Sequence, residues 1–185
     1  MPLAASTDTR RLSTSFGRAL AAALLYAVLA LGAPLGALAD SLQGVVVAVQ
    51  DGDSLTLLDK GKTQHRIRLA GIDAPEKRQP FGQRSKEGLS DLVYRREVSV
   101  EWSKRDRYGR VVGKVLLGRR DINLAQVEAG LAWHYVDYAR EQTSSDRSLY
   151  SQAEARARKA PLGLWRDAAP LAPWTFRKLK HQTAQ

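Results

Sequence analysis

Three short runs of β-forming residues, separated by tight turns, constrain the fold of this chain more than any other feature. They are GVVVAV (residues 44–49), SLTLL (residues 54–58) and HRIRLAGI (residues 65–72). The segments between them, QDGD and DKGK, have the composition of turns, and the first is built on an Asp-Gly pair. Because connections this short join antiparallel neighbours, the three runs predict a β-meander.

The rest of the chain adds two predicted strands and about three predicted helices. The strands are EVSVEW (residues 97–102) and VVGKVLL (Val111–Leu117). Apolar spacing and stop signals predict helices over residues 83–94, 122–129 and about Ser144–Lys159. We expect one face of the last helix to carry Leu149, Ala153 and Ala157. Since the connections are too short for repeated crossovers, we predict an α+β fold, a closed five-stranded β-barrel of the oligonucleotide-binding type (OB-fold) with about three helices.

The chain is strongly basic and contains no cysteine. Its formal net charge is +10 and its pI is about 10.1, which favours an anionic partner such as nucleic acid or membrane headgroups without choosing between them. The absence of cysteine excludes disulfides, thiolate catalysis and cysteine-based zinc sites. The three histidines have no metal-ligand spacing, which argues against zinc-dependent hydrolysis.

The first 39 residues have the pattern of a secretory signal peptide. Three arginines precede an apolar run over residues 19–31, and a small-x-small cleavage pattern follows at residues 37–39. We therefore expect the mature protein to begin near Asp40 and to be exported, periplasmic or secreted. An uncleaved membrane anchor is the alternative interpretation.

Acidic residues follow two strands of the predicted meander. Asp51 and Asp53 flank Gly52 after the first strand, and Asp73 follows the third. An Asp-Gly pair alone is most often an ordinary turn, but a neighbouring strand end would bring Asp73 near Asp53. Two or three carboxylates, with backbone carbonyls and water, form a ligand set that suits Ca²⁺, and Mg²⁺ remains possible.

Other charged residues close to these acids suit phosphate chemistry. The Glu76 carboxylate, beside a metal and a phosphate, is suited to accept a proton from attacking water, although an ordinary surface acid is the alternative. The guanidinium groups of Arg68 and Arg110 suit paired hydrogen bonds to phosphate oxygens. Strict alternation places Arg68 and Asp73 on opposite faces of a strand, so this hypothesis requires Gly71 to reset the facing with a bulge.

Six sequence blocks occur in the order expected of the staphylococcal nuclease-like, or thermonuclease, family, which this chain resembles from Val45 to Trp165. They are DGDSLTLL, RIRLAGIDAPE, QPFG, DRYGRVVGKV, GLAW and GLW. The resemblance implies an OB-type barrel with attached helices and Ca²⁺-dependent hydrolysis of DNA and RNA by an endonuclease that leaves 3′-phosphate products. A noncatalytic OB-fold protein that binds nucleic acid is the alternative.

The resemblance also implies roles for particular residues. The implied metal ligands are Asp53, Asp73 and the backbone carbonyl of Ala74, with Asp51 nearby through water. The implied catalytic residues are Arg68, Glu76 and Arg110, with Glu76 as the general base. The substrate-binding candidates are Arg107, Tyr108, Tyr135 and Tyr138. For the last two tyrosines, packing at the barrel edge is an alternative to stacking on a base.

The resulting prediction is a nuclease domain over residues 40–166, followed by a basic, loosely ordered tail over residues 167–185. We expect it to act as a monomer without an obligate protein partner, on DNA and RNA strands that are single or locally melted. The implied cofactor is Ca²⁺, with Mg²⁺ or another divalent ion possible. The segment KRQP (residues 77–80) is shorter than the mobile loop of the family's best-known member, which leaves open how Glu76 is positioned.

Overall fold

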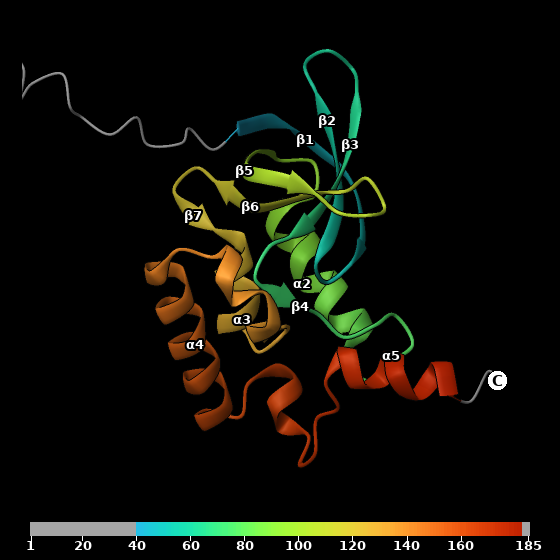
Figure 1. Cartoon of the computed structure of the whole chain (residues 1–185), viewed down its shortest axis with the longest axis vertical. Coiled ribbons are helices and arrows are strands. Elements are labelled where there is room, and N and C mark those ends of the chain that lie inside the picture. Colours follow the sequence, from blue (N-terminus) through green and yellow to red (C-terminus); the bar gives the residue numbers. More distant parts are fainter. Residues whose placement is uncertain (1–39, 183–185) are drawn as a thin grey trace, which may run out of the picture. The chain divides into compact units, whose positions relative to one another are not determined.

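A computed structural model of the chain describes residues 40–182 (Figure 1), and the predicted signal peptide at residues 1–39 lies outside that range. The predicted meander is confirmed. It consists of β1 (Asp40–Asp51), β2 (Ser54–Asp59) and β3 (Gln64–Leu69), which pair in antiparallel order. The predicted third strand therefore ends at Leu69, and residues 70 and 71 form a turn.

Two later strands close the meander into a barrel. β5 (Glu97–Arg105) pairs with the first half of β1, and β6 (Val111–Leu117) pairs with β5. On its other edge β6 pairs with β3 in parallel, which completes the ring. The structure therefore has the predicted α+β architecture, a closed five-stranded barrel of the OB type.

The long strand β1 pairs with two neighbouring strands of this barrel. It pairs with β5 through residues 40–45 and with β2 through residues 44–51. Register shifts between Val46 and Ala48, and between Val49 and Asp51, interrupt its pairing with β2. Since such irregularities bend a strand and increase its twist, they let one strand follow the curve of the barrel.

Helices and short strands complete the described part of the chain. The helices are α2 (Gly82–Val93), α3 (Ile122–Glu128), α4 (Ser144–Lys159) and α5 (Pro173–Gln182), with the 3₁₀ turns η1 (Val136–Glu141) and η2 (Gly163–Arg166). The short strands are β4 (Ile72–Asp73), β7 (Arg120–Asp121) and β8 (Trp133–His134). α2, α3 and α4 match the predicted helices to within about one residue. Within residues 40–182, none of the helices is long and apolar enough to cross a membrane.

Helix α5 occupies a segment for which the sequence predicted a loosely ordered tail. Pro173 is its first residue, a position where the fixed φ of proline suits a helix. Trp174 packs edge-on against Trp133, with 6.4 Å between ring centroids. The prediction considered only the prolines and basic residues of this segment, and it missed the apolar anchor that binds the helix to the domain.

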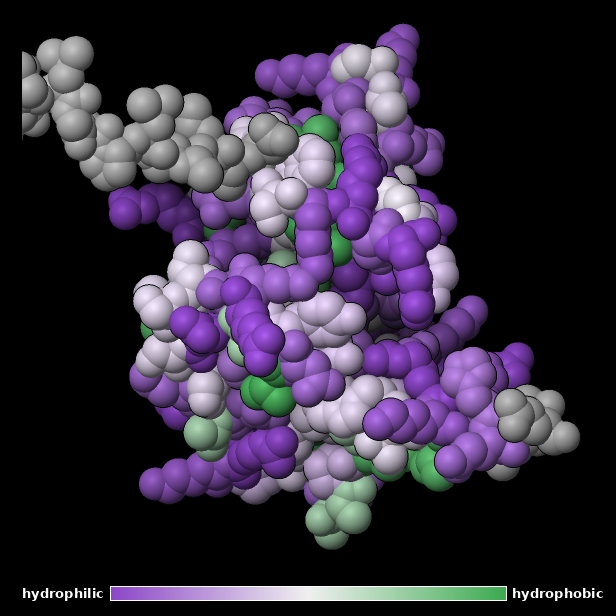
Figure 2. Space-filling view, viewed as in Figure 1, coloured by the Kyte–Doolittle hydropathy of each residue, from purple (hydrophilic) through white to green (hydrophobic). Residues whose placement is uncertain are grey.

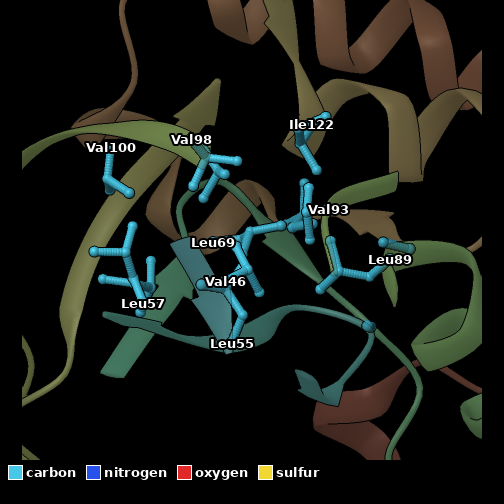
Figure 3. Packing of buried hydrophobic residues seen from close by; sticks show 14 of the residues in the cluster. Val46, Leu55, Leu57, Leu69, Leu89, Val93, Val98, Val100 and Ile122 are labelled. Atoms are coloured by element: carbon cyan, nitrogen blue, oxygen red, sulfur yellow. The ribbon is translucent and has the colours of Figure 1, made fainter. Parts of the chain in front are cut away.

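The hydrophobic core fills the barrel and continues between the barrel and the helices. Figure 3 shows buried side chains of the strands, including Val46, Leu57 and Val100, close to Leu89 and Val93 of α2. On α4 the buried face consists of Tyr150, Ala153 and Ala157.

Leu149 was predicted on this face of α4, but its side chain is 45% exposed. The larger neighbouring Tyr150 occupies the buried position instead, and its hydroxyl donates to Asp121 Oδ2 at 2.8 Å.

Candidate active site

A turn at Gly71 brings Arg68 and Asp73 to the same side of the chain. Gly71 has φ = +72°, a left-handed backbone conformation that favours glycine, and it separates β3 from β4. As a result, Arg68 Nη2 lies 2.9 Å from Asp73 Oδ1 and 3.2 Å from Asp53 Oδ2. The change of facing that the hypothesis required is present, although it arises from a turn between two strands and not from a bulge within one.

The turn between β1 and β2 holds the other two acidic side chains. Asp51 Oδ1 accepts hydrogen bonds from the Asp53 backbone N–H at 3.1 Å and from Ser54 Oγ at 2.7 Å. Asp53 Oδ2 accepts from the Ala74 N–H at 2.6 Å, which ties this turn to the end of β4. Asp53 and Asp73 are only 6% and 2% exposed, so both carboxylates are buried where they meet Arg68.

The electrostatics of Asp53 reflect this crowding. Burial raises the pKa of the Asp53 carboxyl well above its ordinary value. The charge of Arg68 lowers this pKa, whereas the negative charges of Asp51 and Asp73 raise it further. At Asp53, burial and the neighbouring carboxylates therefore outweigh the charge of Arg68.

Helix α3 supplies two buried side-chain amides that bind the turn after β1 and the turn after β3. Asn123 Nδ2 donates to the carbonyls of Ala70 and Gly113 at 3.0 and 3.1 Å. Gln126 Nε2 donates to the Gly52 carbonyl at 2.8 Å and to the Ser85 carbonyl at 3.0 Å. Sequence reasoning missed both residues, and their only local signal was a polar residue on the apolar face of a short helix.

Glu76 is positioned by the short segment that follows it. Its backbone N–H donates to Gln79 Oε1 at 3.1 Å, and its carbonyl accepts from the Gln79 N–H at 2.8 Å. Gln79 is itself buried, and its Nε2 donates to the carbonyl of Leu171. KRQP is thus a compact turn that is fastened to the segment before α5.

Arg177 of α5 reaches the same carboxylates, and sequence reasoning missed it. Its Nη1 lies 2.8 Å from Glu76 Oε1, and its Nη2 lies 2.7 Å from Asp73 Oδ2. Burial alone lowers the pKa of Arg177, but the hydrogen bonds that it donates to Asp73 and Glu76 raise this pKa above its ordinary value overall. Arg177 therefore remains a full positive charge in the site.

The loop between β5 and β6 positions Arg110. Arg110 Nε donates to Asp106 Oδ2 at 2.7 Å, and Asp106 Oδ1 accepts from the backbone N–H groups of Tyr108 and Arg110. Burial raises the pKa of Asp106, but these hydrogen bonds outweigh it and lower the pKa below its ordinary value. The guanidinium groups of Arg107 and Arg110 lie 5.0 and 5.7 Å from the centroid of the exposed Tyr108 ring.

Tyr135 and Tyr138 follow β8 in the chain and lie at the rim of the same pocket. Their ring centroids are 5.0 Å apart. Tyr135 also stacks on Trp174 of α5, with centroids 5.3 Å apart and ring planes at 17°. The two tyrosines therefore pack against other rings at the rim and still border the open pocket.

All eleven site residues selected from the sequence line one pocket of about 850 Å³. They are Asp51, Asp53, Arg68, Asp73, Ala74, Glu76, Arg107, Tyr108, Arg110, Tyr135 and Tyr138. α5 adds Trp174, Arg177, Lys178 and His181 to the lining. Figure 2 shows hydrophilic residues over much of α5 and the surface beside it.

The donor set of this pocket suits a hard divalent cation, although it is not arranged as a preformed cage. Within residues 40–182, no group of three or more His, Asp or Glu side chains is spaced to hold a metal ion. Asp53 and Asp73 nevertheless offer oxygens that converge on one nitrogen of Arg68. A cation on these two carboxylates would offset the effects of burial and of carboxylate repulsion that raise the pKa of Asp53.

The fold and the site together define an OB-type barrel protein in which a pocket combines arginine side chains with buried carboxylates. The sequence model described as "Staphylococcal nuclease homologue" matches residues 66–167, more than half of the chain. A protein of Haemophilus influenzae named "Uncharacterized endonuclease" is 43% identical over 133 residues, which cover 72% of this chain and 71% of the relative.

Relatives from two other bacteria have similar identity over a larger share of their length. An Escherichia coli protein, also named "Uncharacterized endonuclease", is 43% identical over 141 residues, covering 75% of this chain and 87% of its own. A Shigella flexneri protein named "Micrococcal nuclease" is 39% identical over 170 residues, which cover 87% of this chain and 91% of the relative. The chain belongs to the staphylococcal nuclease family, as its sequence blocks predicted.

Proposed function

We propose that this protein is an exported nuclease that hydrolyses phosphodiester bonds of DNA and RNA with Ca²⁺ as cofactor. The observation that carries the proposal is that all eleven residues selected for this chemistry line a single pocket. The relatives named endonuclease and micrococcal nuclease support the hydrolase class. The basic charge of the chain agrees with a polyanionic substrate.

Arg68 and Arg110 are the groups that bind the scissile phosphate. Asp53 and Asp73 contact the guanidinium of Arg68, and Asp106 contacts that of Arg110, so both guanidinium groups are oriented at the pocket before an anion arrives. Guanidinium groups donate two hydrogen bonds to phosphate oxygens and remain charged at any working pH. They stabilise the additional negative charge that develops on the phosphoryl oxygens in the transition state.

Glu76 accepts the proton of the attacking water. Its side chain is 40% exposed toward the pocket, and the compact turn with Gln79 fixes its backbone. A carboxylate in this position takes the proton as the water oxygen attacks phosphorus and the phosphorus bond to the leaving oxygen breaks. The leaving oxygen takes up a proton from solvent water to give the product hydroxyl. Arg177 Nη1 lies 2.8 Å from Glu76 Oε1 and places a positive charge beside this carboxylate.

The proposed ligands of the cation are Asp53, Asp73 and the carbonyl of Ala74, with Asp51 in the outer shell. The staphylococcal nuclease family generally depends on a divalent metal, and Ca²⁺ fits hard oxygen ligands of this kind, with Mg²⁺ as the other candidate. When bound, such an ion neutralises charge on the phosphate and polarises it toward attack.

The substrate is a single or locally melted strand, cleaved internally to leave a 3′-phosphate. Tyr108, Tyr135 and Tyr138 border the pocket with partly exposed rings on which bases can stack, each stacked base contributing about 1–3 kcal/mol. Arg107 lies beside Tyr108 and is suited to a neighbouring phosphate. We propose that the protein acts as a monomer.

The test is the release of acid-soluble nucleotides from denatured DNA and from RNA by the purified mature domain. Cleavage is expected with Ca²⁺ and not with chelator. Glu76→Gln should lower kcat by about 10²–10⁴-fold, the usual contribution of a general base. Glu97→Gln, at an exposed position of β5 outside the pocket, should retain activity.

Full activity of Glu76→Gln would refute the mechanism. Binding of nucleic acid without cleavage under any divalent ion would instead favour the noncatalytic alternative. N-terminal sequencing of exported material tests whether the protein is exported and cleaved near Asp40.

A further inference from the structure

Helix α5 is held against the pocket on two sides. Before the helix, Gln79 donates a hydrogen bond to the carbonyl of Leu171. Within it, Trp174 stacks on Tyr135 at 5.3 Å and meets Trp133 edge-on at 6.4 Å. These contacts come from residues near Glu76 and from the tyrosine rim, so the helix is placed by the same elements that form the candidate site.

The helix also decides the sign of the charge in the pocket. Apart from His181, seven basic and six acidic side chains line the pocket. Arg177 and Lys178 are two of the seven, so without α5 the acidic side chains would outnumber the basic ones. Without a bound cation, a polyanion that enters the pocket is therefore attracted by a side-chain charge excess that depends on α5, and α5 adds to the charge of the cation when it is bound.

Arg177 lies between the buried carboxylates and the open part of the pocket. Its partner Asp73 is only 2% exposed, whereas the side chain of Arg177 is 39% exposed. A divalent cation at Asp53 and Asp73 would supply the positive charge that Arg177 now gives to Asp73. The guanidinium would then be available to an anion in the pocket while remaining beside Glu76.

We propose that α5 forms a second phosphate-binding wall of the active site. Arg177 and Lys178 bind the backbone phosphates of a nucleic-acid strand next to the bond that is cleaved, while Arg68 and Arg110 bind the scissile phosphate. This inference rests on the proposed function. It assigns a substrate-binding role to the segment from Pro173 to Gln182, which none of the six sequence blocks contains.

The test measures strand binding separately from cleavage. The double variant Arg177→Gln, Lys178→Gln is compared with Lys159→Gln, Arg166→Gln, which removes two exposed charges outside the pocket. Fluorescence anisotropy measures the Kd of each variant for a labelled, hydrolysis-resistant phosphorothioate oligothymidine. The measurements are made in Ca²⁺ over a range of salt concentrations.

The α5 double variant should bind about tenfold or more weakly than wild type. Its slope of log Kd against log salt should fall by about 1.4, because a single strand loses about 0.7 for each phosphate contact removed. The control should stay within about threefold and retain the slope, and Arg177→Lys, which keeps the charge, should recover most of the affinity.

Two results would overturn the inference: an affinity and slope equal to those of the control, or weaker binding with an unchanged slope, which indicates a structural role. Its failure is distinguishable from failure of the proposed function. A wild-type protein that binds the strand through α5 but cleaves no unmodified nucleic acid refutes only the nuclease mechanism. Cleavage by wild type, with α5 variants that bind like the control, refutes only the role of α5.

Discussion

Gly52, between Asp51 and Asp53, has no room for a side chain, and its replacement by alanine should show how tightly the acidic turn is held. A Cβ at this position would lie 1.7 Å from Ser85 Oγ and 2.6 Å from Ser85 Cβ. It would also lie 2.8 Å from the Cβ of Ala74. Gly52 has no positive φ, so alanine is excluded by space and not by backbone conformation.

The expected cost follows from these contacts. Ser85 cannot turn away freely, because its hydroxyl donates to the Leu131 carbonyl at 2.6 Å. Loss of that hydrogen bond costs about 1 kcal/mol, and overpacking typically costs about 1–3 kcal/mol. We therefore expect Gly52→Ala to lower the free energy of unfolding by about 2–4 kcal/mol. Because Asp53 adjoins the displaced residue, nuclease activity should also fall by about tenfold or more.

Urea denaturation in chelator measures the loss of stability, and a double-mutant cycle identifies its cause. Ser85→Gly removes the two nearest of the three clashing atoms and leaves only the Cβ of Ala74 at 2.8 Å. Alone it should cost about 2 kcal/mol through the lost hydrogen bond and a glycine within α2. Gly52→Ala combined with Ser85→Gly should be less destabilised than the sum of the single variants by about 1–2 kcal/mol.

The matched control is Gly61→Ala in the exposed turn between β2 and β3. The nearest atom to a Cβ there, Asp59 Oδ1, is 3.3 Å away, so we expect a change within about 1 kcal/mol. Single-variant effects that add within about 0.5 kcal/mol, or a Gly52→Ala protein as stable as the control, would refute the steric argument.

Two further predictions concern the neighbouring buried groups. Because burial raises the pKa of Asp53, the stabilisation linked to its protonated form is present below the ordinary carboxyl pKa and lost as pH rises through the raised value. The free energy of unfolding of Asp53→Asn, measured by urea denaturation in chelator, should therefore increase relative to that of wild type between about pH 4 and pH 8. A difference that stays constant with pH would contradict this prediction. Gln79→Met removes the hydrogen bonds to Glu76 and Leu171, so it should cost about 1–3 kcal/mol in urea and also lower kcat. Unchanged kcat would mean that Gln79 does not position Glu76.

Much of the barrel could be predicted because its signals are local. Alternating and β-branched residues marked the strands, and short polar segments marked the turns, which is why β6 and α4 have the bounds that were predicted. The short strands β4, β7 and β8 have two residues each, too few for any alternation to be visible. α5 was missed because its stability depends on the packing of Trp174 against distant rings.

The sequence by itself determined which chemical groups the site contains and in what order they occur along the chain. Arg68, Asp73 and Glu76 stand within nine residues of one another, and their ordered blocks predicted both the family and the pocket lining. These inferences were possible because residue type and spacing depend only on neighbours along the chain.

Only the tertiary structure decided how those groups are held and what else joins them. Gln126 holds the carbonyl of Gly52 across 74 residues, and Arg177 reaches Glu76 across 101. The periodicities of strands and helices report contacts within a few residues, and they do not specify which distant side chains will meet. The packing of α3 on the barrel and of Trp174 of α5 on Trp133 and Tyr135 settles that choice. Burial of these apolar groups places Gln126 at the Gly52 carbonyl and Arg177 in the pocket.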